Sequence, residues 1–194
     1  MKSFIAVFLI FSSLGFTQNT RELNSLWDEI RRNSNLEFDS TRSEIISAAD
    51  KYDGHQYLIN RLSKNGQRYL YYTVKEALKK GLPVELSLIP FVESQFDPYA
   101  QSSTGASGIW QFIPSTAREN GLKKNWWYDG RRDILASTEA AYTFLTSLYE
   151  KYDDWLIAIA AYNAGPSRIR REIEKNKSNG CLLYTSPSPR DPSI

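Results

Sequence analysis

The sequence predicts an all-α protein, and three observations carry that prediction. Apolar residues recur at helical spacing in several separate segments. No segment alternates between apolar and polar residues for long enough to predict a strand. The chain has 194 residues, 41% hydrophobic and 24% charged, which is the size and composition of one globular domain. We therefore expect a single helical domain, preceded by one or two N-terminal helices.

Residues 1–17 have the features of a secretory signal peptide. Lys2 supplies the positive charge, and residues 4–11 form an apolar segment that is too short to span a bilayer. No cysteine directly follows this segment, so we expect no lipid anchor and no stable membrane insertion once the signal is cleaved. The segment predicts an exported protein, either periplasmic or associated with the cell envelope.

Residues 18–65 are expected to form an N-terminal helical region. Residues 21–33 predict an amphipathic helix, because one face carries Leu23, Leu26, Trp27 and Ile30. Residues 37–51 are a weaker helical candidate. His55 is the only histidine, and no second ligand stands at metal-binding spacing, so we expect no metal site and no cofactor.

Residues 66–180 are expected to form the main helical domain. A helix over residues 60–80 leads into it, with Gly81 as its C-terminal cap. The next helix is expected to begin near Pro83, since proline is tolerated at the first helical position. Glu85 then suits the positive end of the helix dipole.

The stretch that organises this domain is residues 84–111. An apolar run follows Glu85, and helical spacing places Leu86, Ile89 and Glu93 on one face. Apolar surroundings disfavour the charged form of a carboxylate and raise its pKa. Glu93 is therefore a candidate general acid, which must keep its proton near neutral pH.

The residues after Glu93 predict a loop that could bind a carbohydrate. Asp97 and Pro98 signal a turn, and Gly105 and Gly108 allow the backbone to approach another group closely. An aromatic plate and an amide follow, supplied by Trp110 and Gln111. Thirteen per cent of the residues are aromatic, which also fits a sugar-stacking groove, although core packing is the commoner use.

The segment after this loop predicts a short helix and a second loop. Thr116 and Glu119 have the spacing of a capping box, and Gly121 would end the helix. Trp126 and Trp127 follow in the second loop, either as a platform under a sugar ring or as a plug against the core. Arg131 and Asp133 are expected to orient the loop backbone.

The last part of the domain predicts two helices and the start of a third. Residues 138–152 have a clear helical period, Asp154 can cap the next helix, and residues 155–164 are apolar on all sides and should be buried. Tyr162 and Asn163 in this helix need partners. They could satisfy each other and the backbone, or they could face Glu93 across a cleft.

The sequence of the final residues, 181–194, differs in character from the rest of the domain. The run CLLYTSPSPRD resembles the translation of a sequencing adapter, so we expect a non-native tail; the alternative is a natural tail rich in serine and proline. Excluding the tail removes the only cysteine. It also implies a domain truncated at its C-terminal end, which we expect to be less stable than the natural protein.

Three ordered segments resemble lytic transglycosylases of the goose-lysozyme-like superfamily. They are residues 93–94, residues 102–111 and residues 161–165, the last with the sequence Ala-Tyr-Asn-Ala-Gly. Trp110 and its flanking residues are most similar to the membrane-bound lytic transglycosylase D group. The resemblance covers residues 69–168 and implies a lysozyme-like fold.

The resemblance implies a reaction with a single carboxylate. Glu93 would protonate the oxygen of the β-1,4 bond between N-acetylmuramic acid and N-acetylglucosamine, while the substrate's N-acetyl group stabilises the charge at C1. Glu93 would then accept the proton of the C6 hydroxyl, which closes onto C1 as a 1,6-anhydro ring without water. Glu85 and Asp97 fit a second catalytic carboxylate poorly, because neither is expected in an apolar setting.

The resemblance also implies roles for the other candidate residues. Ser102 and Gln111 would hydrogen-bond the substrate or Glu93, and Tyr162 would position the reacting sugar or Glu93. The remaining candidates would shape the cleft or contact the glycan: Gly105, Gly108, Trp110 and Asn163.

Two alternatives remain open. One is a hydrolytic muramidase on the same fold, which would need a placed water and a second carboxylate. The other is a non-catalytic glycan-binding module.

A net charge of +2 gives no case for nucleic acid binding, and we expect a monomer whose partner is the peptidoglycan strand.

Overall fold

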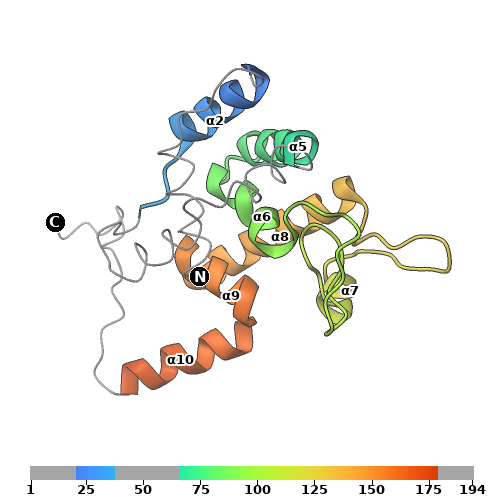
Figure 1. Cartoon of the computed structure of the whole chain (residues 1–194). Coiled ribbons are helices and arrows are strands. Elements are labelled where there is room, and N and C mark those ends of the chain that lie inside the picture. The colour runs from blue at the N-terminus through green and yellow to red at the C-terminus, as the bar shows by residue number, and fades with distance from the viewer. Residues whose placement is uncertain (1–20, 38–65, 179–194) are drawn as a thin grey trace. The chain divides into compact units, whose positions relative to one another are not determined.

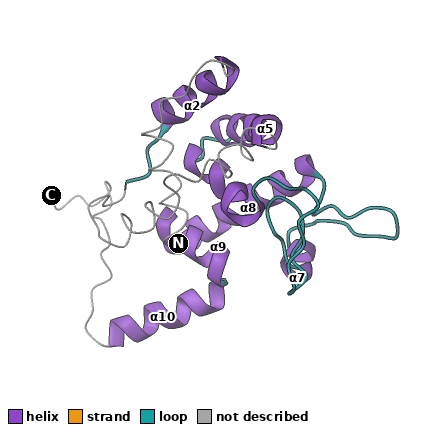
Figure 2. Ribbon diagram, in the orientation of Figure 1, coloured by secondary structure: helices purple, strands orange, loops and turns teal. Residues whose placement is uncertain are grey.

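The computed structural model describes residues 21–37 and 66–178, and all the regular elements in these ranges are helices (Figure 1; Figure 2). The all-α prediction is therefore confirmed. The expectations for the signal peptide, for most of residues 37–51, for His55 and for the C-terminal tail lie outside the described residues. The chain divides into two compact units, Met1–Tyr142 and Thr143–Ile194, which are described separately.

Three segments pack on one another in the core of the first unit: α2 (Arg21–Asn33), α5 (Gln67–Lys79) and the 3-10 helix η2 (Val84–Leu88). The predicted helix 21–33 is confirmed, and Leu26, Trp27 and Ile30 of its apolar face are buried. The buried apolar side chains of the two α-helices are Leu26, Trp27, Ile30, Leu70, Val74 and Ala77. Every residue of η2 is buried, so this short segment is the centre of the unit.

The expectation of one continuous helix after Pro83 is wrong. The chain forms η2 first and then a separate helix, α6 (Ile89–Ser94). Pro90 explains the break, because a proline inside a helix lacks the backbone N–H and its ring collides with the preceding turn. At the start of α6 the same residue is tolerated.

Glu85 lies in the first turn of η2, as expected of a charge at a helix start, but the expectation that it has no apolar, buried setting is wrong. Its side chain is 1% exposed, and its Oε1 accepts hydrogen bonds from the Ser34 hydroxyl (2.6 Å) and from the backbone N–H groups of Asn35 (2.9 Å) and Leu36 (2.8 Å). Glu85 Oε2 is buried without a hydrogen-bond partner in the described part of the chain. A buried carboxylate therefore joins the segment after α2 to the centre of the unit.

The short helix α7 (Pro114–Glu119) begins at Pro114 and ends near Gly121, so the predicted capping box is wrong: Glu119 is its last residue rather than its third. The following helix, α8 (Ile134–Tyr152), starts earlier than residue 138. Asp133 explains the earlier start, since its Oδ1 accepts the backbone N–H groups of Leu135 and Ala136, both at 3.0 Å.

In the second unit, the end of α8 packs with α9 (Trp155–Ala164) and α10 (Pro166–Ser178). Asp154 caps α9 as predicted, by accepting the N–H of Ile157 at 3.0 Å. Burial of α9 on all sides is not observed; its buried residues are Ala158, Ile159 and Ala161. In the described ranges no helix combines the length and apolar character required to cross a membrane.

Candidate active site

Glu93 lies near the C-terminal end of α6 and is half-buried. Burial raises the pKa of its carboxyl group above the ordinary value of 4.5. The prediction made from the apolar run is thus confirmed in its direction. Glu93 can hold its proton closer to neutral pH than a solvated glutamate can.

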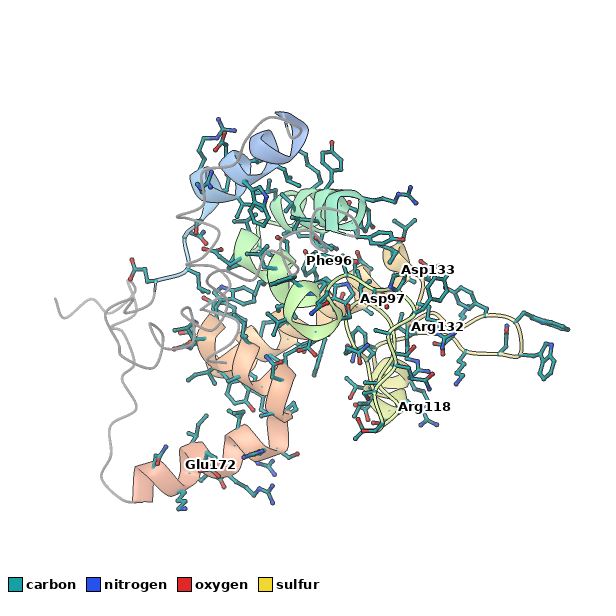
Figure 3. The ribbon with its side chains drawn as sticks, in the orientation of Figure 1. Phe96, Asp97, Arg118, Arg132, Asp133 and Glu172 are labelled. Carbon is teal, nitrogen blue, oxygen red and sulfur yellow. The ribbon has the colours of Figure 1, made fainter. Side chains whose placement is uncertain are left out.

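The chain reverses sharply directly after Glu93. Gln95 and Phe96 both have positive φ, 54° and 57°, which is uncommon for residues other than glycine. The Phe96 side chain is fully buried, and burying a large apolar side chain offsets the strained backbone. Phe96 and the next residue, Asp97, are labelled in Figure 3 where the chain leaves α6.

Ser94 connects the acid-bearing helix to the loop of residues 100–112, which we call the glycine loop. The Ser94 hydroxyl lies 2.9 Å from the carbonyl oxygen of Ile109 and 3.2 Å from that of Pro90, and it can donate to either. The glycine loop is therefore held to the same turn of helix that carries Glu93.

Ser102 builds the first turn of the glycine loop. Its hydroxyl accepts the N–H of Ala106 at 2.9 Å and pairs with the Thr104 hydroxyl at 2.9 Å. Gly105 has φ +83°, and a side chain there would meet open space. The predicted contacts of Ser102 and Gly105 with substrate remain predictions, since both residues are only partly buried.

Gly108 does not have the predicted role of approaching a glycan. It is buried with φ +82°, and a Cβ atom there would lie 1.7 Å from the carbonyl oxygen of Arg131. The close approach is real, but it is made to the protein's own backbone. Gly108 lets the glycine loop pack against the loop that precedes α8.

Trp110 is not an aromatic plate for a sugar, because its side chain has no exposed surface. Its Nε1–H donates to the Thr138 hydroxyl at 2.9 Å, and its ring meets that of Tyr142 edge-on at 5.3 Å. The Tyr142 hydroxyl in turn donates to the carbonyl of Thr73 at 2.6 Å. Trp110 thus fastens the glycine loop to α8, and through Tyr142 to α5.

The side-chain amide of Gln111 forms hydrogen bonds within the glycine loop itself. Nε2 donates to the carbonyl oxygens of Gly108 (2.8 Å) and Ala100 (3.2 Å), and the residue has φ +49°. The side chain is half-buried, so a contact with substrate through its carbonyl oxygen stays a prediction.

Arg131 also holds the glycine loop, through its guanidinium group. The residue is 5% exposed, and Nη1 donates to the carbonyls of Gly105 (2.7 Å) and Phe112 (3.3 Å). Its Nε and Nη2 donate to the two oxygens of Asp129, at 2.9 and 2.6 Å. These bonds lower the pKa of the Asp129 carboxyl and keep it ionised. The expectation that Arg131 orients loop backbone is confirmed, with burial that the sequence did not indicate.

Tyr162 and Asn163 lie on α9, in the second unit. The Tyr162 ring packs against Phe144 with 5.7 Å between centroids, and Asn163 Nδ2 donates to the carbonyl of Ile159 at 2.9 Å. Asn163 is exposed and Tyr162 half-buried. Because the two units are described separately, their placement opposite Glu93 remains a prediction.

The other two carboxylates near Glu93 in the sequence, Glu85 and Asp97, both accept hydrogen bonds from the protein itself. Glu85 binds the segment after α2, as described above, and Asp97 accepts the backbone N–H of Tyr99 at 2.9 Å in a turn. Within residues 21–37 and 66–178 no group of three His, Cys, Asp or Glu side chains could hold a metal ion.

Comparison with known proteins places this geometry in a family. The profile described as "Transglycosylase SLT domain" matches residues 71–183. Over 150 residues the chain is 43% identical to the membrane-bound lytic murein transglycosylase D of Escherichia coli (strain K12). That match covers 76% of this chain and 33% of the relative, so the chain spans about a third of the relative's length.

Two further relatives extend the comparison. A protein of Alteromonas sp. (strain M-1), named for tributyltin chloride resistance, is 41% identical over 135 residues, which is 68% of this chain and 65% of that protein. The membrane-bound lytic murein transglycosylase F of Desulfosudis oleivorans is 30% identical over 171 residues, 80% of this chain and 35% of that protein.

Proposed function

Because the chain belongs to the transglycosylase SLT domain family, we propose that it is a peptidoglycan lytic transglycosylase. It cleaves the β-1,4 bond between N-acetylmuramic acid and N-acetylglucosamine without water and leaves 1,6-anhydro ends. The E. coli and Desulfosudis relatives are named for this class of activity on murein. The proposed place of action is the cell envelope, after export, as a monomer.

The observation that carries the proposal is the state of Glu93. It is half-buried, its pKa is raised by burial, and it stands beside a loop fixed by Ser94 and Arg131. Such a carboxylic acid can protonate the glycosidic oxygen and, once ionised, accept the proton of the C6 hydroxyl. A pKa near the working pH suits a residue that acts as acid and then as base.

A single-carboxylate reaction is supported by what the neighbouring acids do. Hydrolysis by two carboxylates requires a second group free to act as nucleophile or to activate water. Glu85 is buried and accepts three hydrogen bonds, and Asp97 accepts a backbone hydrogen bond within a turn. The proposed substrate contacts are Ser102, Gly105, Gln111, Tyr162 and Asn163.

The test is digestion of purified peptidoglycan by the chain and by its Glu93→Gln variant, followed by mass spectrometry of the released muropeptides. We expect anhydro ends from the wild type and a loss of at least about a hundredfold in the variant, the scale of a general acid's contribution. Asp97→Asn is the matched control and should retain activity.

Each other result has a definite meaning. Products heavier by one water, together with an inactive Asp97→Asn variant, would replace the proposal with a hydrolytic muramidase. Binding to peptidoglycan without any cleavage by the wild type would replace it with a glycan-binding module.

A further inference from the structure

Two adjacent tryptophans between α7 and α8 are exposed to solvent. Trp126 is 87% exposed and Trp127 is 86% exposed, more than any other large apolar side chain in the described part of the chain. In Figure 1 the loop that carries them extends well beyond α7. The interpretation of the pair as a plug against the core is therefore wrong. Large apolar side chains that gather on a surface mark a place of interaction.

The loop that carries the pair, residues 123–130, is closed by hydrogen bonds between its own residues, and we call it the tryptophan loop. Asn125 Oδ1 accepts the backbone N–H groups of Trp127 (3.0 Å) and Tyr128 (2.8 Å), and the Asn125 N–H donates to the Tyr128 carbonyl at 2.8 Å. The Gly130 N–H donates to the carbonyl of Lys123 at 2.8 Å. A fixed loop presents its side chains to a ligand with little further loss of entropy on binding.

The base of the tryptophan loop is joined to the glycine loop. Asp129 holds the Arg131 guanidinium, which donates to the carbonyls of Gly105 and Phe112. The Arg131 backbone packs on Gly108. Because Ser94 fastens the glycine loop to α6, the acid and the tryptophan pair belong to one hydrogen-bonded frame.

We propose that Trp126 and Trp127 bind the glycan strand at a second position, away from the bond that is cleaved. This inference rests on the proposed function for its choice of ligand. A sugar ring presents a flat face of C–H groups with hydroxyls at its edge, and an indole offers a flat apolar face with one N–H donor. The two rings meet edge to face, at 6.1 Å and 88°, so they offer two differently directed faces to neighbouring sugars.

The setting of the pair favours a saccharide over a lipid surface. The residues that precede the two tryptophans are polar: Lys123, Lys124 and Asn125 are all exposed. Membrane-surface segments instead combine a continuous apolar face with basic residues along the opposite face. Two perpendicular rings on a polar loop do not form such a face.

The test measures binding in a chain that does not cleave. The Glu93→Gln variant and the triple variant that adds Trp126→Ala and Trp127→Ala are compared for retention on insoluble peptidoglycan stripped of protein. We expect the triple variant to bind about tenfold more weakly, the scale of losing aromatic anchor residues. The control adds Tyr71→Ala, which removes an exposed ring (57%) on α5 and should leave binding unchanged.

The same proteins are also tested on anionic phospholipid vesicles. Equal retention of all three on peptidoglycan would overturn the inference, as would a tryptophan-dependent binding to vesicles alone. Unchanged circular dichroism and melting temperature of the triple variant would show that a loss of binding does not reflect unfolding. Since binding is read in the Glu93→Gln background, failure of the proposed cleavage activity would appear in a separate experiment with the wild type.

Discussion

At the scale of single residues, Gly105 and Gly108 show how similar backbone conformations can have different causes. Both have φ near +80°, in the region that favours glycine. An added Cβ at Gly105 would meet nothing within 4 Å, whereas at Gly108 it would collide with the Arg131 carbonyl. The first glycine serves the turn alone, and the second serves the packing of two loops.

This difference predicts unequal effects of the same substitution. Gly105→Ala should lower the free energy of unfolding by about 1 kcal/mol, the cost of a positive φ for alanine. Gly108→Ala should lower it by more than about 3 kcal/mol, because the Arg131 backbone must also move. Urea denaturation of the two variants measures both values, and equal losses would contradict the role given to Gly108.

At the scale of elements, Glu85 joins the segment after α2 to the part of the first unit that carries Glu93. Its Oε1 accepts three donors from the residues that follow α2, and two of these donors are backbone N–H groups. Apolar burial of Leu26 and Ile30 against the core acts in the same direction. The segment that carries Glu85 also leads directly into α6, so the same carboxylate supports the helix that presents Glu93.

Removing this carboxylate should release α2. We expect Glu85→Ala to lower the free energy of unfolding by about 2–4 kcal/mol, because partly buried donors lose their acceptor. Amide hydrogen exchange in α2 should rise more than in α7. Lys75→Ala is the matched control, since it removes an exposed ion pair with Glu29 (2.7 Å) and a contact with the exposed Tyr71 ring, and should have little effect. Similar exchange in α2 for both variants would contradict the inference.

At the scale of the whole molecule, periodic patterns predicted most of the fold. Residues 21–33 and 155–164 are helices with the expected bounds, because periodicity and caps are local signals. Periodicity does not reveal the division into η2 and α6, because Pro90 lies inside an apolar run that has the pattern of one helix.

The candidate site was predicted only in part. The direction of the Glu93 pKa shift followed from the apolar run around it. The burial of Trp110 and Glu85 could not be predicted, because it depends on Thr138, Tyr142 and Ser34, which are distant in the sequence. The role of Gly108 likewise depends on a contact with residue 131 that no local pattern reveals.

The ionisable groups predict how the stability of the whole molecule varies with pH. The Asp129 pKa is lowered from its ordinary 3.8 chiefly by its hydrogen bond to Arg131, so its contribution is present above that value and is lost as pH falls through the folded pKa. Backbone hydrogen bonding by Asp133, chiefly to Ala136, acts in the same direction. The Glu93 pKa is raised by burial, so its ionisation destabilises the fold as pH rises above 4.5.

The two trends should be separable by mutation. Relative to wild type, Glu93→Gln should gain stability between pH 4 and neutral pH, because glutamine carries no charge to bury. Asp129→Asn should lose stability at neutral pH, and this loss should shrink as pH falls below about 3.8, because the Asp129 carboxyl then takes up its proton in the unfolded chain before it does so in the folded one. Urea denaturation of the three proteins between pH 3 and pH 8 measures these differences.

A stability difference between Glu93→Gln and wild type that does not change with pH would show that Glu93 titrates alike in the folded and unfolded chain. In that case the acid would not be held in the protonated state that the proposed reaction requires.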